Sequence, residues 1–124
     1  MKAVGIDAIE IQRVADAIER HGERFLARVY TEAERRLGGE RGRASSQFYA
    51  GRFAAKEAVL KALGTGYAQG LAFTDVEILP GPSGEPVLTL HGAARDRAAE
   101  TGIALILVSI THTRTDAYAV AVAE

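Results

Sequence analysis

The sequence predicts a single domain that mixes α-helices with β-strands, and two observations support this. The chain has 124 residues, which is near the commonest size for one domain. Apolar residues have helical spacing through most of the first half, whereas short strand-like runs lie at both ends and over 72–90. The composition is that of a globular protein, with 48% hydrophobic and 25% charged residues and no apolar run of the roughly 20 residues that span a membrane.

The chain is predicted to begin with a strand and a helix. Residues 2–6 are apolar on both faces, which indicates a short internal strand that Asp7 ends. A helix follows over 9–21, and Gly22 is its C-terminal cap. The apolar stripe of this helix consists of Ile11, Val14, Ala15 and Ile18.

Two short helices and a loop are predicted next. The first helix covers 23–29. Thr31 begins the second, because Glu34 three residues later completes a capping box. Residues 38–43 form a polar loop rich in glycine and arginine, to which the sequence assigns no role.

The long helix predicted over 47–63 is the central element. Ser45 or Ser46 is expected to cap its start, and Gly64 to end it. Its apolar stripe contains Tyr49, Phe53, Leu60 and Leu63.

The second half is predicted to hold four strands and one helix. The strands cover 72–79, 86–90, 103–111 and 117–123, and the helix covers 91–101. The segment Pro-Gly-Pro-Ser-Gly is a turn between the first two strands. In the last strand, one face carries Tyr118, Val120 and Val122 and the other only alanines, which favours close packing.

Composition and charge exclude several classes of function. The chain has no cysteine, which excludes disulfides, zinc–thiolate sites and cysteine nucleophiles. Its N-terminus has no apolar h-region of a secretory signal, so we expect a cytoplasmic protein. Residues 1–62 carry 12 basic and 9 acidic side chains, a net charge of +3 in a chain of net charge −1. This asymmetry is too small to predict nucleic-acid binding, and nothing predicts a membrane partner.

Lys56 is the strongest physical anomaly in the sequence, because it falls in the middle of the apolar stripe of the long helix. An unpaired buried charge costs roughly several kcal/mol, so Lys56 requires a partner or a purpose. One hypothesis is a phosphate or metal site, which the like charges of Arg52 and Lys56 favour. The other is a solvated helix face, supported by the i, i+4 pair of Glu57 and Lys61.

Two other segments carry candidate residues. Asp7 lies between a strand and a helix, where it is either a magnesium ligand or part of an Asp-x-x-Glu capping box with Glu10. His112 follows a predicted strand, where a lone histidine is commonly structural. Gly64-Thr65-Gly66 either ends the long helix or lets the backbone approach a ligand, and it is too short for a P-loop.

Three motifs together resemble those of a known family. They are Gly-Ile-Asp-Ala-Ile-Glu-Ile over 5–11, Arg-Phe-Ala-Ala-Lys-Glu-Ala over 52–58 with its continuation to Gly66, and Ser-Ile-Thr-His-Thr over 109–113. In order and spacing they are similar to the holo-(acyl-carrier-protein) synthases, the short trimeric class of 4′-phosphopantetheinyl transferases. Ala8 and Thr111 depart from the usual Ile and Ser of the family, and neither change removes a charged group.

The resemblance implies an α+β fold over 1–124, in which an antiparallel sheet packs with the long central helix. It also implies a magnesium-dependent transfer of the phosphopantetheine arm of coenzyme A to a serine of apo acyl carrier protein, which releases adenosine 3′,5′-bisphosphate. The carrier protein belongs to fatty-acid or polyketide synthesis. Homotrimers with coenzyme A between the subunits are implied, and the alanine face of the last strand fits tight packing in such a trimer.

The resemblance also assigns residues to roles. Asp7 and Glu57 are the implied metal ligands, and Lys61 contacts the pyrophosphate and assists the leaving group. The implied contacts to coenzyme A are Arg52, Lys56, Lys61, Gly64, Thr65 and His112. The base is either a metal-bound water or one of the two carboxylates.

Acyl carrier proteins are acidic, and in this family arginines of the first helix meet them. The matching side chains are Arg13, Arg20 and Arg24, with Arg28 beyond them. The structural alternative is that Arg20 pairs with Asp16 one turn away.

An alternative function is a module that binds coenzyme A or a nucleotide without catalysis. Such a module needs the cations but has no need of both Asp7 and Glu57, which are present here.

Overall fold

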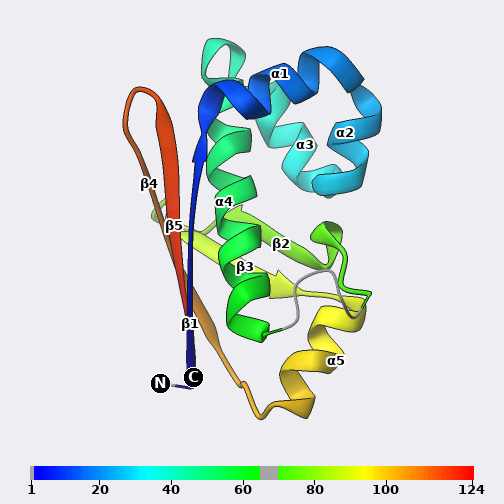
Figure 1. The fold of residues 1–124 in the computed structure, drawn as a ribbon, viewed down its shortest axis with the longest axis vertical. Helices are drawn as coiled ribbons and strands as arrows, with labels where there is room; N and C mark the ends of the chain where they lie inside the picture. The colour runs from blue at the N-terminus through cyan, green and yellow to red at the C-terminus, as the bar shows by residue number, and fades with distance from the viewer. Residues whose placement is uncertain (1, 65–69) are drawn as a thin grey trace.

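The computed structural model describes residues 2–64 and 70–124. A long helix, α4 (Ser45–Leu63), lies between an antiparallel sheet and the remaining elements (Figure 1). The sheet has the strand order β1-β5-β4, formed by Ala3–Glu10, Asp116–Ala123 and Ile106–His112. This arrangement is the α+β fold that the resemblance implies.

The other elements cover the opposite side and the two ends of α4. Near its N-terminal end lie α1 (Ile11–His21), α2 (Glu23–Val29), α3 (Glu32–Gly39) and the 3₁₀ turn η1 (Gly42–Ala44) (Figure 1). Further along lie the 3₁₀ turn η3 (Phe73–Asp75), the hairpin of β2 (Val76–Pro80) and β3 (Pro86–Leu90), and α5 (Gly92–Glu100).

Helix α4 is the core of the molecule. Twelve of its 19 residues are buried, so it is covered on nearly all sides instead of along one stripe. In the part of the chain that the structure describes, no helix has the length and apolarity needed to cross a membrane.

The sheet approaches α4 closely because its inner face is built from small residues. All four alanines of β5, at 117, 119, 121 and 123, are 3% exposed or less. On β1, a Cβ atom at Gly5 would lie 1.9 Å from the carbonyl oxygen of Ala58. The prediction of close packing on the alanine face is therefore confirmed. This face packs on α4 of the same chain, so it is not available for contact between subunits.

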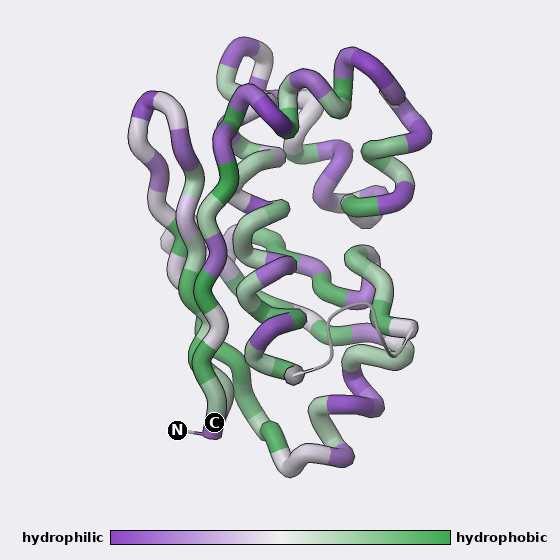
Figure 2. The backbone as a smooth tube through the Cα atoms, viewed as in Figure 1, coloured by the Kyte–Doolittle hydropathy of each residue, from purple (hydrophilic) through white to green (hydrophobic). Residues whose placement is uncertain are grey.

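The outer face of the same sheet carries exposed apolar side chains. Ile6 is 65% exposed and Leu107 is 56% exposed. The strand register places Val4, Tyr118, Val120 and Val122 on this face as well. Figure 2 shows hydrophobic residues along these strands and mainly hydrophilic ones on α1. A single chain thus leaves an apolar sheet surface open.

Several sequence predictions of local structure are confirmed. The helix at 23–29 and the strand at 86–90 have the predicted bounds. Thr31 and Glu34 form the predicted capping box at the start of α3. Gly64 ends α4 in the left-handed conformation, with φ of 85°.

Other boundaries were predicted wrongly. The strand does not end at Asp7, because pairing with β5 carries β1 on to Glu10, and α1 begins only at Ile11. Neither Ser45 nor Ser46 caps α4, whose N-cap is Ala44 and which continues directly from η1. The strand predicted from 72 begins at Val76, because η3 occupies 73–75. The strand predicted from 103 begins at Ile106.

We predict that Gly5→Ala strongly destabilises the protein. The added methyl group would meet the backbone of α4, which has no room to yield, so we expect a loss of about 3 kcal/mol or more. Urea unfolding of both proteins measures the difference. Gly39→Ala is the matched control, because no atom lies within 4 Å of its Cβ position and its stability should be unchanged or slightly higher. Equal stability of Gly5→Ala and the parent would contradict the close packing described here.

Candidate functional site

Asp7 and Lys61 meet where β1 crosses α4. The alternation of β1 turns Gly5 and Asp7 toward the helix. The Nζ atom of Lys61 donates to the backbone oxygen of Ile6 at 2.9 Å and to Oδ1 of Asp7 at 3.0 Å. The Asp7 side chain is 15% exposed and that of Lys61 53%, so the pair lies at the molecular surface. A carboxylate and an ammonium group are therefore presented together to solvent.

Asp7 does not cap a helix. It lies inside β1 opposite Ala119, and Glu10 is the N-cap residue of α1, without a side-chain capping bond. The capping-box alternative for Asp7 and Glu10 is therefore wrong. The carboxylate of Asp7 is directed toward α4, where it pairs with Lys61.

Glu57 joins this pair from α4. It precedes Lys61 by four residues and so lies one turn away on the same face of the helix. It also directly precedes Ala58, the residue against which Gly5 packs. The two carboxylates thus come from different elements, β1 and α4, that are held in contact. We define Asp7, Glu57 and Lys61 as the acidic cluster.

The acidic cluster suits a hard divalent cation that is held only partly by protein. Among the described residues, no group of three or more His, Cys, Asp or Glu side chains forms a complete metal site. Magnesium commonly takes one or two carboxylates and completes its octahedron with water and substrate phosphate oxygens. The donor set of Asp7 and Glu57 fits that mode of binding.

A second group of charged residues lines a pocket of about 150 Å³ near the start of α4. Arg52 comes from α4, His112 from the end of β4, and Arg41 from the segment before η1. The guanidinium carbons of Arg41 and Arg52 lie 4.9 and 4.5 Å from the ring centre of Phe48. We define Arg41, Arg52 and His112 as the basic pocket.

The basic pocket is suited to an anion. Burial lowers the pKa of Arg52, and the charge of Arg41 lowers it further, whereas Glu34 opposes the shift. The two guanidinium groups of Arg41 and Arg52 repel each other around this space unless an anion lies between them. The structure therefore brings Arg52 and His112 together at one pocket. Arg41 was not among the predicted site residues, although the arginines of the 38–43 segment were the available signal.

The acidic cluster and the basic pocket lie on opposite sides of α4. Arg52 and Lys61 are nine residues apart, which at 100° per residue is a rotation of about 180° around the helix. One chain therefore does not bring the two groups into a single cleft.

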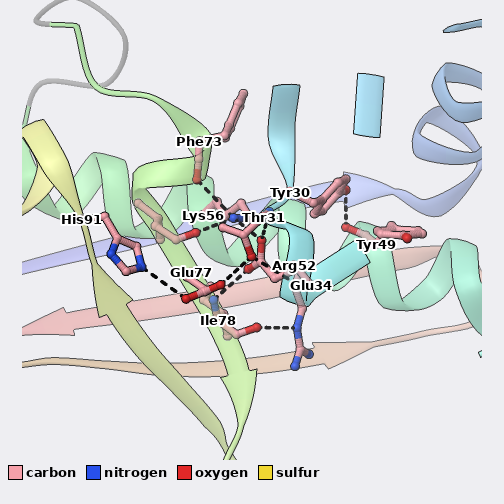
Figure 3. A network of polar contacts seen from close by, with 11 residues as sticks. Tyr30, Thr31, Glu34, Tyr49, Arg52, Lys56, Phe73, Glu77, Ile78 and His91 are labelled. Carbon is pink, nitrogen blue, oxygen red and sulfur yellow. Dashed lines mark hydrogen bonds and ion pairs between the residues drawn. The ribbon is translucent and has the colours of Figure 1, made fainter. Parts of the chain in front are cut away.

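Lys56 is fully buried and is not available to a ligand (Figure 3). Its ammonium group forms an ion pair with Oε1 of Glu34 at 2.7 Å. It also donates to the backbone oxygens of Phe73 and Val76. Burial lowers the pKa of Lys56, while the charge and hydrogen bond of Glu34 act in the opposite direction. All three donors are used, which corrects the expectation that Lys56 contacts coenzyme A. The solvated-face alternative is wrong as well.

The end of α4 is fixed by α5. The Nε atom of Arg97 donates to the backbone oxygen of Leu63 at 3.0 Å, directly before the cap residue Gly64. Gly64 thus acts as a helix terminator in this structure. Thr65 lies outside the described residues, so its predicted contact with the nucleotide stays a prediction.

The arginines assigned to the carrier protein are exposed on α1 and α2. These are Arg13, Arg20 and Arg24. Within the described residues none of the three has an ion-pair partner, and Asp16 accepts from Gln12 at 2.8 Å instead of pairing with Arg20. The local alternative for Arg20 is therefore not formed, and this surface presents free positive charge.

The chain is similar to known proteins over nearly its whole length. Residues 3–123 match the family described as "4'-phosphopantetheinyl transferase superfamily". A holo-[acyl-carrier-protein] synthase of Solidesulfovibrio magneticus is 48% identical over 124 residues, which are 100% of this chain and 98% of the relative.

Solved structures are also similar. The holo-[acyl-carrier-protein] synthase of Neisseria meningitidis has a TM-score of 0.89 and 29% identity, covering 100% of this chain and 98% of the other. That of Helicobacter pylori, solved in complex with coenzyme A, has a TM-score of 0.85 and 32% identity, covering 98% of this chain and 99% of the other.

Proposed function

Because this chain belongs to the 4′-phosphopantetheinyl transferase superfamily, we propose that it transfers phosphopantetheine from coenzyme A to apo acyl carrier protein. The acceptor is a serine hydroxyl, and adenosine 3′,5′-bisphosphate is released. The relatives named holo-[acyl-carrier-protein] synthase support this activity, and one of them binds coenzyme A. The observation that carries the assignment to residues is the contact between Asp7 and Lys61 beside Glu57.

Asp7 and Glu57 are the proposed magnesium ligands. When bound, the cation neutralises charge on the pyrophosphate of coenzyme A. The chain itself supplies Lys61, whose ammonium group is held at the same place by Ile6 and Asp7 and stabilises the departing phosphate oxygen. For the serine proton, the proposed acceptor is one of the two carboxylates or a water held by the cation. No nucleophile of this chain is needed, since the carrier protein brings its own.

The basic pocket is the proposed site for further phosphate groups of coenzyme A, including the 3′-phosphate. Arg52 and His112 were expected there, and Arg41 is added because it lines the same space. Guanidinium groups suit phosphate because their planar N–H donors bind two oxygens at once. Lys56 is left out of the proposed site because it is buried.

A homotrimer is proposed to join the two groups of residues. Since the acidic cluster and the basic pocket face opposite sides of α4, one ligand reaches both only if each comes from a different subunit. The exposed apolar outer face of the sheet, with Ile6 and Leu107, is the proposed contact between subunits.

The lack of cysteines supports our proposal of a cytoplasmic location.

The exposed arginines of α1 and α2 are the proposed docking surface for the acidic carrier protein. None of these arginines forms an ion pair among the described residues, so their guanidinium groups can bind an acidic helix, although Asp16 and Glu19 line the same hollow as Arg20. Steering of this kind weakens as salt rises.

We predict that Asp7→Asn and Glu57→Gln each reduce transfer at least about a hundredfold, because each removes a charge that holds the cation. Intact mass of apo acyl carrier protein, incubated with enzyme, coenzyme A and magnesium, measures the added phosphopantetheine. A chelator should abolish the reaction of the parent. Glu100→Gln, an exposed carboxylate on α5, is the control and should remain active. Full activity of Glu57→Gln would overturn the metal site. Binding of coenzyme A by the parent without any transfer would favour the non-catalytic module.

We predict that Arg13→Ala and Arg20→Ala raise the KM for the carrier protein roughly fivefold to tenfold with little change in kcat, because they remove attraction outside the reacting centre. Steady-state kinetics at low and high salt measure this, and the difference from the parent should shrink at high salt. Arg95→Ala removes the same charge from exposed α5 and serves as the control. An unchanged KM in both α1 variants would remove this surface from the proposal.

A further inference from the structure

Glu34 and Lys56 form a buried ion pair for which the proposed reaction has no use. Both side chains are 0% exposed, and they are the fully buried charged residues of the described chain. Glu34 comes from the first turn of α3, and Lys56 from the middle of α4 (Figure 3). Removing two charges from water is expensive, and well-packed apolar residues frequently serve stability as well or better. Stability alone therefore does not explain this ion pair, and the contacts that it makes indicate another role.

The carboxylate of Glu34 holds three separate groups. Its Oε1 accepts from the backbone N–H of Thr31 at 2.9 Å and pairs with Nζ of Lys56 at 2.7 Å. Its Oε2 accepts from the backbone N–H of Ile78 at 2.7 Å. One side chain thus ties together the start of α3, the middle of α4 and strand β2.

The peptide groups of Ile78 connect Glu34 to the basic pocket. The backbone N–H of Ile78 is held by Glu34, and its backbone oxygen accepts from Nε of Arg52 at 3.3 Å (Figure 3). With Nε engaged there, the guanidinium of Arg52 lies over the ring of Phe48 at the basic pocket. The orientation of Arg52 therefore depends on the position of β2.

Lys56 holds the same edge of β2 as Glu34 does. It donates to the backbone oxygens of Phe73 and Val76, at the entry to β2, while its Glu34 partner holds Ile78. Lys56 lies one turn after Arg52 on α4, so the helix and the strand are fixed to each other at two consecutive turns. Loss of the pair would release β2 and, with it, the acceptor of Arg52.

We propose that Glu34 is a positioning residue for coenzyme A, which acts through Lys56 and the Ile78 backbone to hold Arg52 in the orientation that binds phosphate. This inference rests on the proposed role of Arg52. It predicts that removal of the pair weakens binding of the phosphates of coenzyme A and leaves the affinity for carrier protein unchanged.

The test uses the double variant Glu34→Gln/Lys56→Met, which removes both charges and leaves neither one buried alone. Calorimetry with adenosine 3′,5′-bisphosphate and with coenzyme A measures affinity, and kinetics measure the two KM values. We expect both dissociation constants and the KM for coenzyme A to rise about tenfold, with the KM for carrier protein unchanged. Glu34→Gln alone keeps one acceptor oxygen for Ile78. Because it leaves the charge of Lys56 buried without its carboxylate partner, we expect it to be less stable than the double variant. Where it is folded, it should weaken binding by a smaller factor in the same direction, and melting curves of both variants decide which one is used for the affinity measurement.

Two comparisons separate positioning from stability. Tyr30→Phe removes a buried hydrogen bond to the backbone oxygen of Tyr49 in the same core, and should lower the melting temperature without changing nucleotide affinity. In an Arg52→Ala background, loss of the Glu34–Lys56 pair should weaken binding no further, because the group through which it acts is gone. Independent, additive losses would overturn the inference.

The outcomes also distinguish this inference from the function on which it rests. If Arg52→Ala weakens nucleotide binding but a folded Glu34 variant does not, only the positioning role is overturned. If Arg52→Ala binds both nucleotides as well as the parent, the assignment of Arg52 to phosphate fails and the positioning role fails with it.

Discussion

The close contact between strand β1 and helix α4 is the constraint on which the rest of the structure depends. Gly5 leaves no space for a side chain against Ala58, and the alanines of β5 extend the same close approach across the sheet. This spacing brings Asp7 within hydrogen-bond distance of Lys61, one helical turn from Glu57. Larger residues on the inner face would separate the two carboxylates that we propose as metal ligands.

A single helix thus carries residues for two different tasks. One side of α4 holds the acidic cluster, suited to a cation and a pyrophosphate, and the other side contributes Arg52 to the basic pocket. Between them lies the buried pair of Lys56 and Glu34, which fixes α4 to α3 and β2. The two groups of residues lie on opposite sides of one helix, and the apolar face of the sheet is open. Both observations support the proposal of a site shared between subunits.

Local signals predicted much of the fold, and long-range contacts account for what they missed. The capping box at Thr31 and the terminator at Gly64 depend on neighbouring residues and were predicted correctly. The extension of β1 past Asp7 depends on pairing with β5, more than 100 residues away. For Lys56 the sequence revealed the anomaly but not its partner, because Glu34 is brought to it by the packing of α3.

The most direct test of the account is complementation between two inactive variants. Glu57→Gln removes one carboxylate of the acidic cluster, and Arg52→Ala removes one guanidinium of the basic pocket. Each homo-oligomer should therefore transfer little phosphopantetheine. When the two chains are unfolded together and refolded as mixed oligomers, a site between subunits should become intact at about a quarter of the interfaces. We predict recovery of transfer to about that fraction of parent activity. If mixed oligomers form and transfer stays at the level of the separate variants, each site lies within one chain and the account is contradicted.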